Sequence, residues 1–204
     1  MREEAKLVGN YVSYQIQRLT GPEQGSASRA AFARLRRGIG KAPGSMPELW
    51  DATLNGLPVE LLSRDGRPSY GEWAVHTTLT LFALHQQGSD PKTSCMNRDG
   101  VYLGKAIRGL VRTEEDMTRV KRRFDAAATS DSLTEFSHHL RGLIQLLKAA
   151  EIPLDYPALA KDIYWYQFEG VRDRIRLRWG QDFYHHPIQD RDKDTAANQE
   201  TGGE

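Results

Sequence analysis

Helix start signals recur along this sequence, and each is followed by apolar residues at helical spacing. A serine or threonine stands three positions before an acidic residue at Ser45–Glu48, Ser69–Glu72, Thr113–Asp116 and Ser132–Glu135. The hydroxyl can accept a hydrogen bond from a free backbone N–H of the first turn, and the acidic side chain can accept another, so this pattern favours a helix start. No segment shows a convincing alternation of apolar and polar residues, which would indicate a strand. The sequence therefore predicts an all-α fold with no significant β-sheet.

The helices expected from these signals account for most of the chain. The segment after Ser69 is apolar on most sides, which is typical of a helix at the centre of a bundle. Glycine and proline mark the expected breaks, and we expect Gly180 to interrupt the last helix. The expected helices span about 5–19, 28–39, a short segment opened by 45–48, 69–84, 101–111, 113–128, 132–147, 155–166 and 171–179.

A length of 204 residues allows one domain or two small ones. We expect two small helical bundles packed together, residues 1–112 with a basic helix and residues 113–186. A boundary near Ala128 and a hinge in the loop 87–100 are alternatives. Residues 187–204 are polar and charged. We expect them to form a disordered tail, because they cannot bury enough surface to offset the entropy of ordering.

The composition limits the class of protein. The chain carries 28 basic and 27 acidic residues, a formal net charge of +1, and its mean hydropathy is −0.62. No apolar run approaches the roughly 20 residues of a membrane-spanning helix, and the N-terminus lacks the apolar stretch of a secretory signal. The single cysteine, Cys95, excludes an internal disulfide. We expect a soluble cytoplasmic protein with no membrane partner.

Basic residues are concentrated in residues 24–47, a stretch without an acidic residue. Phe32 and Leu35 lie on one face of the expected helix, and Arg34 and Arg37 point away from that face. Guanidinium groups match phosphate oxygens, so such a helix suits a nucleic-acid backbone. A basic helix face that is simply solvated is the alternative. The candidate nucleic-acid-binding residues of this stretch are Arg29, Arg34, Arg36, Arg37 and Lys41.

Later helices carry further cationic clusters. The additional candidates for nucleic-acid binding are Lys105 and Arg108, then Arg119, Arg122 and Arg123, and finally Arg141. The arginines between 172 and 178 have acidic neighbours, and we expect those to form salt bridges inside the bundle. Aromatic residues between Tyr164 and Tyr184 are able to stack on bases, but their helical spacing favours a place in the core.

Patterns of catalytic or metal-binding residues are poor. The sequence has neither a His-Glu-x-x-His motif nor paired cysteines for zinc. Neighbouring side chains of a helix point in different directions, so the doublets His138-His139 and His185-His186 make poor chelates. We expect every histidine to be structural or exposed. The Gly38–Lys41 segment lacks the serine or threonine that follows the lysine of a phosphate-binding loop. We expect no catalytic residue, no metal and no cofactor.

Several segments of the chain, each helical and leucine-rich on its own, occur in a joint order that is fairly specific. The segments are AAFARLRR at 30–37 followed by PELW at 47–50, LTLFALHQQ at 79–87, LGKAIRGL at 103–110, RRF at 122–124 leading into LRGL at 140–143, and the run 155–184. In this order they resemble the CasB family, the small subunit of the type I-E CRISPR surveillance complex Cascade. The resemblance covers about residues 28–184.

The resemblance implies an all-α subunit without catalysis of its own. Family members sit as a head-to-tail pair inside the complex and contact its backbone subunits and its large subunit. They hold guide RNA and target DNA in place, and contact with the displaced DNA strand is also implied. Arg34 and Arg37, Lys105 and Arg108, and Arg122, Arg123 and Arg141 are the positions that match basic residues of the family.

Two other classes of protein remain open from the residues alone. A free-standing helical dimeric DNA-binding regulator would place a basic helix in the major groove and prefer palindromic duplexes. A helical hydrolase or nuclease would use some of the plentiful aspartate and glutamate residues, and it predicts metal-dependent cleavage of nucleic acid.

Overall fold

The computed structural model describes residues 1–21 and 25–185, and this part of the chain is all-α as predicted. It contains no strand, and its one β-bridge joins Asn97 to Leu154. No helix in these residues has both the length and the apolar character needed to cross a membrane. The elements are α1 (Arg2–Thr20), α2 (Gly25–Arg37), η1 (Pro47–Leu49), α3 (Trp50–Thr53), η2 (Val59–Leu61), α4 (Tyr70–His85), α5 (Leu103–Arg108), α6 (Glu114–Ala128), α7 (Leu133–Ala149), α8 (Tyr156–Tyr166) and α9 (Glu169–Tyr184).

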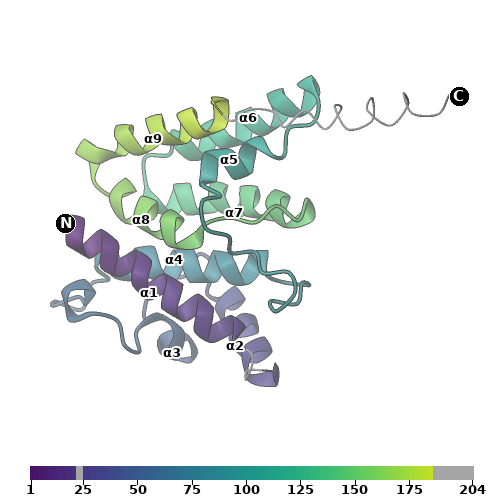
Figure 1. Ribbon diagram of the computed structural model, residues 1–204. Helices are drawn as coiled ribbons and strands as arrows, with labels where there is room; N and C mark the ends of the chain where they lie inside the picture. The colour runs from purple at the N-terminus through teal and green to yellow at the C-terminus, as the bar shows by residue number, and fades with distance from the viewer. Residues whose placement is uncertain (22–24, 186–204) are drawn as a thin grey trace, which may run out of the picture.

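Helix α4 lies at the centre of the molecule. Figure 1 shows α1, α2 and α3 on one side of it, α7 and α8 on the other, and α5, α6 and α9 beyond those two. Helices α1, α2, α7 and α8 all pack directly on α4. Every residue of α4 from Ala74 to His85 is buried, so the predicted central helix is confirmed.

The predicted helix starts are confirmed at three of the four signals. Ser69 and Glu72 form a complete capping box on α4, Thr113 Oγ1 caps α6, and Ser132 Oγ caps α7. The box expected at Ser45 is wrong, because η1 begins only at Pro47 and has no side-chain cap. Ser45 Oγ donates instead to the carbonyl of Ala42, within the turn that precedes the helix.

Two expected helix boundaries are also wrong. Helix α5 covers only Leu103–Arg108, because the chain tightens after it into turns in which Leu110 N donates to Ile107 O. Helix α9 continues through Gly180, where a Cβ atom would meet open space. A glycine in a helix costs about 1 kcal/mol, and the buried Trp179 and Phe183 on either side outweigh that cost.

Most aromatic side chains of the C-terminal helices lie in the core, as their spacing predicts, whereas Tyr184 is exposed. The rings of Phe136, Tyr166 and Trp179 stack on one another with centroids 4.4 to 5.6 Å apart. Asp162 accepts hydrogen bonds from Trp179 Nε1, at 2.6 Å, and from the Arg178 guanidinium. The predicted internal salt bridge is therefore confirmed for Arg178, whose partner Asp162 is buried, whereas Arg176 pairs with the exposed Asp173 at the surface.

Contacts between the two ends of the chain are extensive. Helix α1 packs along α8, and Tyr164 OH donates to a carboxylate oxygen of Glu4 at 2.6 Å. Helix α5 packs on α9. The division into bundles at residues 112 and 113 stays a prediction, and the expected tail at 187–204 lies outside the described residues.

The crossing of α5 and α9 gives a stability test. A Cβ at Gly104 would overlap the Trp179 carbonyl oxygen, whereas a Cβ at Gly180 meets open space. We expect Gly104→Ala to lower the free energy of unfolding by about 1–3 kcal/mol through overpacking, and Gly180→Ala to raise it by up to about 1 kcal/mol. Urea unfolding measures both, and an unchanged midpoint for Gly104→Ala would contradict the close packing.

The buried His85 gives a pH test. Its Nδ1 lies 2.9 Å from Tyr156 OH, and burial lowers the pKa of the imidazole to about 4. The unfolded chain takes up this proton near pH 6.5, so the stability is present above that pH and is lost as the pH falls toward 4. The loss is on the order of 3 kcal/mol. Urea midpoints between pH 7.5 and 4.5 should fall less steeply for His85→Gln, and parallel slopes would count against His85 as the source.

Candidate nucleic-acid interface

Helix α2 has the amphipathic arrangement that the sequence predicts. Phe32 and Leu35 are buried against α4, and Arg34 and Arg37 are exposed. This surface is not purely basic, because acidic residues from η1 and α3 lie beside it. Arg37 Nη2 is 3.4 Å from a carboxylate oxygen of Glu48. The positive charge of α2 is therefore partly compensated in the folded protein.

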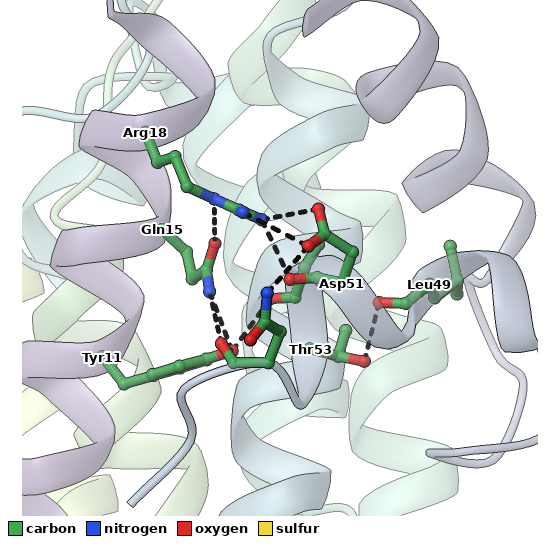
Figure 2. Close-up of polar contacts among 8 residues, drawn as sticks. Tyr11, Gln15, Arg18, Leu49, Asp51 and Thr53 are labelled. Carbon is green, nitrogen blue, oxygen red and sulfur yellow. Dashed lines mark hydrogen bonds and ion pairs between the residues drawn. The ribbon is translucent and has the colours of Figure 1, made fainter. Parts of the chain in front are cut away.

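A polar network holds the acidic segment beside α2. Figure 2 shows Arg18 of α1 reaching Asp51 of α3, with Nη2 2.9 Å from Oδ2, while Gln15 joins Arg18 to Tyr11. Hydrogen bonds from Arg18 and Asn55 lower the pKa of Asp51, and the positive charges of Arg18 and Arg34 act in the same direction. Asp51 is thus an ionised partner for the basic residues around it.

Arg29 and Arg36 lie on a different part of α2. They line a hollow between α2 and the segment 86–92, which also contributes Asp90 and Lys92. Lys41 lies beyond the end of the helix and lines a separate cavity. The structure therefore divides the five basic residues of this stretch among three separate surfaces.

A further basic concavity lies between α6 and α7. It is an open groove of about 850 Å³ whose walls include Arg119, Arg122 and Arg123 of α6 and His138 and His139 of α7. One carboxylate, Glu115, also lines it. Cations therefore outnumber anions in the walls of this groove.

The arginines of the groove differ in whether they already form an ion pair. Arg119 is paired with Asp116 one turn earlier in α6. Arg122 and Arg123 are exposed and form no hydrogen bond or ion pair within the described part of the chain. Both guanidinium groups keep their donors available for an anion.

Amphipathic packing places these side chains on the groove. Helix α6 buries Val120, Phe124 and Ala127, and α7 buries Phe136 and Leu140 along the seam between the two helices. Arg119 and Arg123 each stand one position before a buried residue of α6, and Arg122 lies midway between Val120 and Phe124, so all three line the groove. The apolar stripe thus fixes where the arginines lie.

A smaller pocket lies next to the groove. Lys41 and Arg141 both line it, although they are 100 positions apart in the sequence, and α4 provides its floor. Its volume is about 230 Å³. His138 lines both this pocket and the α6–α7 groove, so the two cavities are neighbours.

The basic residues of α5 lie elsewhere. Lys105 and Arg108 are half-buried, and the Arg108 guanidinium lies over the Phe183 ring at 6.0 Å from its centroid. Its Nη1 atom is buried without a hydrogen-bond partner among the described residues. Arg108 is therefore part of the junction between α5 and α9, and the structure does not bring these two residues into the groove.

Sequence reasoning did not select His138 and His139 as binding residues. It treated them as structural or exposed histidines, since adjacent positions make a poor chelate. A signal was present, because His138 precedes Arg141 by three positions and shares its face of the helix. His76 and His85 are buried, as expected for structural histidines. In residues 1–21 and 25–185 no three histidine, cysteine or acidic side chains gather as metal ligands would.

Solved structures of CasB proteins share this architecture. The chain is 28% identical to CasB from Thermobifida fusca, with a TM-score of 0.73 over 87% of this chain and 97% of that one. It is 22% identical to CasB from Thermus thermophilus, with a TM-score of 0.66 over 87% and 98% of the two chains. For M. ruber CasB the identity is 19% and the TM-score 0.60 over 92% and 97%.

Two comparisons of the sequence itself gave different results. No curated protein sequence matches the chain. The resemblance to CasB that the sequence indicates is nevertheless confirmed by a family model, described as CRISPR-associated protein Cse2, which matches residues 31–184. Since that match spans well over half of its length, the chain belongs to the CRISPR-associated Cse2 family.

Proposed function

We propose that the chain is the non-catalytic small subunit of a type I-E CRISPR RNA-guided surveillance complex in the cytoplasm. Family membership and the likeness to CasB structures support a subunit role. The proposed partners are the backbone subunits and the large subunit of Cascade, the guide RNA, the target and displaced DNA strands, and a second copy of the chain.

The observation that carries the nucleic-acid part of this proposal is the α6–α7 groove. Arg122 and Arg123 line it, and neither forms an ion pair with a described residue. Among the described residues, Glu115 is the one carboxylate in its walls. Unpaired arginines bind phosphate oxygens whatever the base sequence. A subunit of this kind stabilises a strand that is already paired with a guide, while base pairing supplies the specificity.

The same surface tests the proposal. We expect Arg122→Glu combined with Arg123→Glu to weaken target binding by the reconstituted complex tenfold or more, about 1.4 kcal/mol per tenfold. Each lost phosphate contact also removes up to about one unit from the slope of log affinity against log salt. Binding of labelled target DNA between 50 and 300 mM salt, about the range in which such contacts are screened, measures both quantities.

A matched control separates the groove from overall charge. Arg64 and Arg174 are exposed, form no ion pair with a described residue and do not line the groove. Changing both to glutamate alters the net charge by the same amount. Equal losses in the two double variants would contradict a local role for the groove.

A free-standing DNA-binding regulator remains the alternative function. Its support is the exposed basic surface of α2. It requires the isolated chain to prefer one palindromic duplex over others, whereas the proposed subunit does not discriminate among duplex sequences.

A further inference from the structure

The pocket that contains Lys41 and Arg141 gathers side-chain groups that lack partners among the described residues. It is lined by residues 39–41 after α2, by α4 and by α7, and its volume is about 230 Å³. No aspartate or glutamate occurs among the described residues that line it. A pocket with cations and no carboxylate favours an anionic ligand.

Both cations are available to such a ligand. The side chains of Lys41 and Arg141 are exposed and form no hydrogen bond or ion pair within the described residues. The loop that presents Lys41 is held in place, since Lys41 N donates to Gly38 O at 3.0 Å and Gly40 takes a φ of +74° that suits glycine. The lysine is thus presented by an ordered turn.

Trp73 is an aromatic side chain without an aromatic partner in residues 1–21 and 25–185. It is half-buried and lines the same pocket. Among the described tryptophans, Trp165 and Trp179 contact other rings and Trp50 donates its indole N–H to Gly44 O. Trp73 has neither a ring contact nor a side-chain hydrogen bond with a described residue. An indole N–H usually takes a hydrogen-bond partner, and that of Trp73 is left to solvent or to a ligand.

His76 adds a buried polar atom at the same place. It is 2% exposed and its Nε2 lies 3.0 Å from Gly38 O, while its Nδ1 has no hydrogen-bond partner among the described residues. A carbonyl oxygen only accepts, so Nε2 carries the proton. Burial lowers the pKa of His76, although the carbonyls of Gly38 and Lys41 oppose this. The neutral ring therefore leaves Nδ1 as an acceptor.

We propose that this pocket binds one unstacked nucleotide, with its base on the Trp73 indole and its phosphate between Lys41 and Arg141. The inference rests on the proposed nucleic-acid function and names the ligand of one site within it. The volume of about 230 Å³ lies below the roughly 300–1,000 Å³ of ordinary small-molecule sites, so the pocket has room for no more than one nucleotide. Since His138 joins the pocket to the α6–α7 groove, a strand lying in the groove can place one nucleotide in the pocket. Aromatic stacking makes such a site tolerant of base identity.

A fluorine NMR titration of the isolated full-length chain tests this proposal. The protein is labelled with 5-fluorotryptophan, and Trp73→Phe identifies the resonance of Trp73. We expect uridine 5′-monophosphate to shift that resonance saturably. Arg141→Ala and Lys41→Ala should each weaken binding about tenfold, the effect of one lost charge-assisted hydrogen bond. Arg64→Ala, an exposed arginine outside the pocket, should leave the affinity unchanged.

Two probes without a base complete the test. Ribose 5-phosphate and inorganic phosphate should bind more weakly than the nucleotide and leave the Trp73 resonance nearly unmoved. Equal affinity for all three probes, or a nucleotide that does not move Trp73, would overturn the nucleotide pocket. Arg141→Ala is checked for unchanged helix content by circular dichroism.

This experiment is independent of the complex. If the nucleotide fails to bind while the Arg122 and Arg123 double variant weakens target binding, the pocket is wrong and the proposed function stands. If the nucleotide binds while the double variant behaves like its control, the groove role is wrong and the pocket stands.

Discussion

Burial of α4 on all sides is the constraint on which the rest of the structure depends. Leu79, Leu81 and Phe82 are at most 1% exposed, and helices from both ends of the chain pack on α4. Truncating one such side chain costs about 2–5 kcal/mol, against a total stability of about 5–15 kcal/mol for a protein of ordinary size. Helix α4 also forms the floor of the Lys41–Arg141 pocket. The parts of the candidate interface are therefore assembled by the apolar core.

The electrostatic properties of the surface follow from what each amphipathic helix meets beside it. Helix α2 lies next to Glu48 and Asp51, which compensate part of its positive charge. Helix α6 carries carboxylates of its own, and two of them pair with Arg119 and Lys121, which leaves Arg122 and Arg123 on the groove between α6 and α7 without an ion pair to a described residue. In both helices, therefore, neighbouring carboxylates compensate some basic side chains and leave others without an ion pair in the described part of the chain. Near a surface the local charges decide the potential, and the net charge of +1 says little about it.

Local chemistry explains why much of the fold was predictable. The Ser69–Glu72 capping box and the apolar helix after it depend on neighbouring residues only, and both are confirmed. The Ser45 box failed because the first turn starts at Pro47 as a 3-10 helix, which a spacing rule does not distinguish from an α-helix. Gly180 does not end α9 as expected, because burial of its neighbours Trp179 and Phe183 stabilises the helix by more than the small free energy that a glycine costs.

The candidate site was predictable only in part. Arg122 and Arg123 were selected because they cluster in sequence, and the structure places them in one groove. The meeting of Lys41 with Arg141, and of both with Trp73, depends on how α4 and α7 pack, and no local pattern encodes it. Lys105 and Arg108 were selected because they share a helix face in the sequence. That pattern did not reveal that Arg108 packs over Phe183.

The most direct test of the central claim is to map where nucleic acid touches this chain in the assembled complex. Ultraviolet crosslinking of the complex with guide RNA and target DNA, followed by mass spectrometry, identifies the peptides that carry a nucleotide. The account predicts crosslinked peptides from α6 and α7, which line the groove. Crosslinks confined to α2, or none on this subunit in a complex that binds its target, would contradict it.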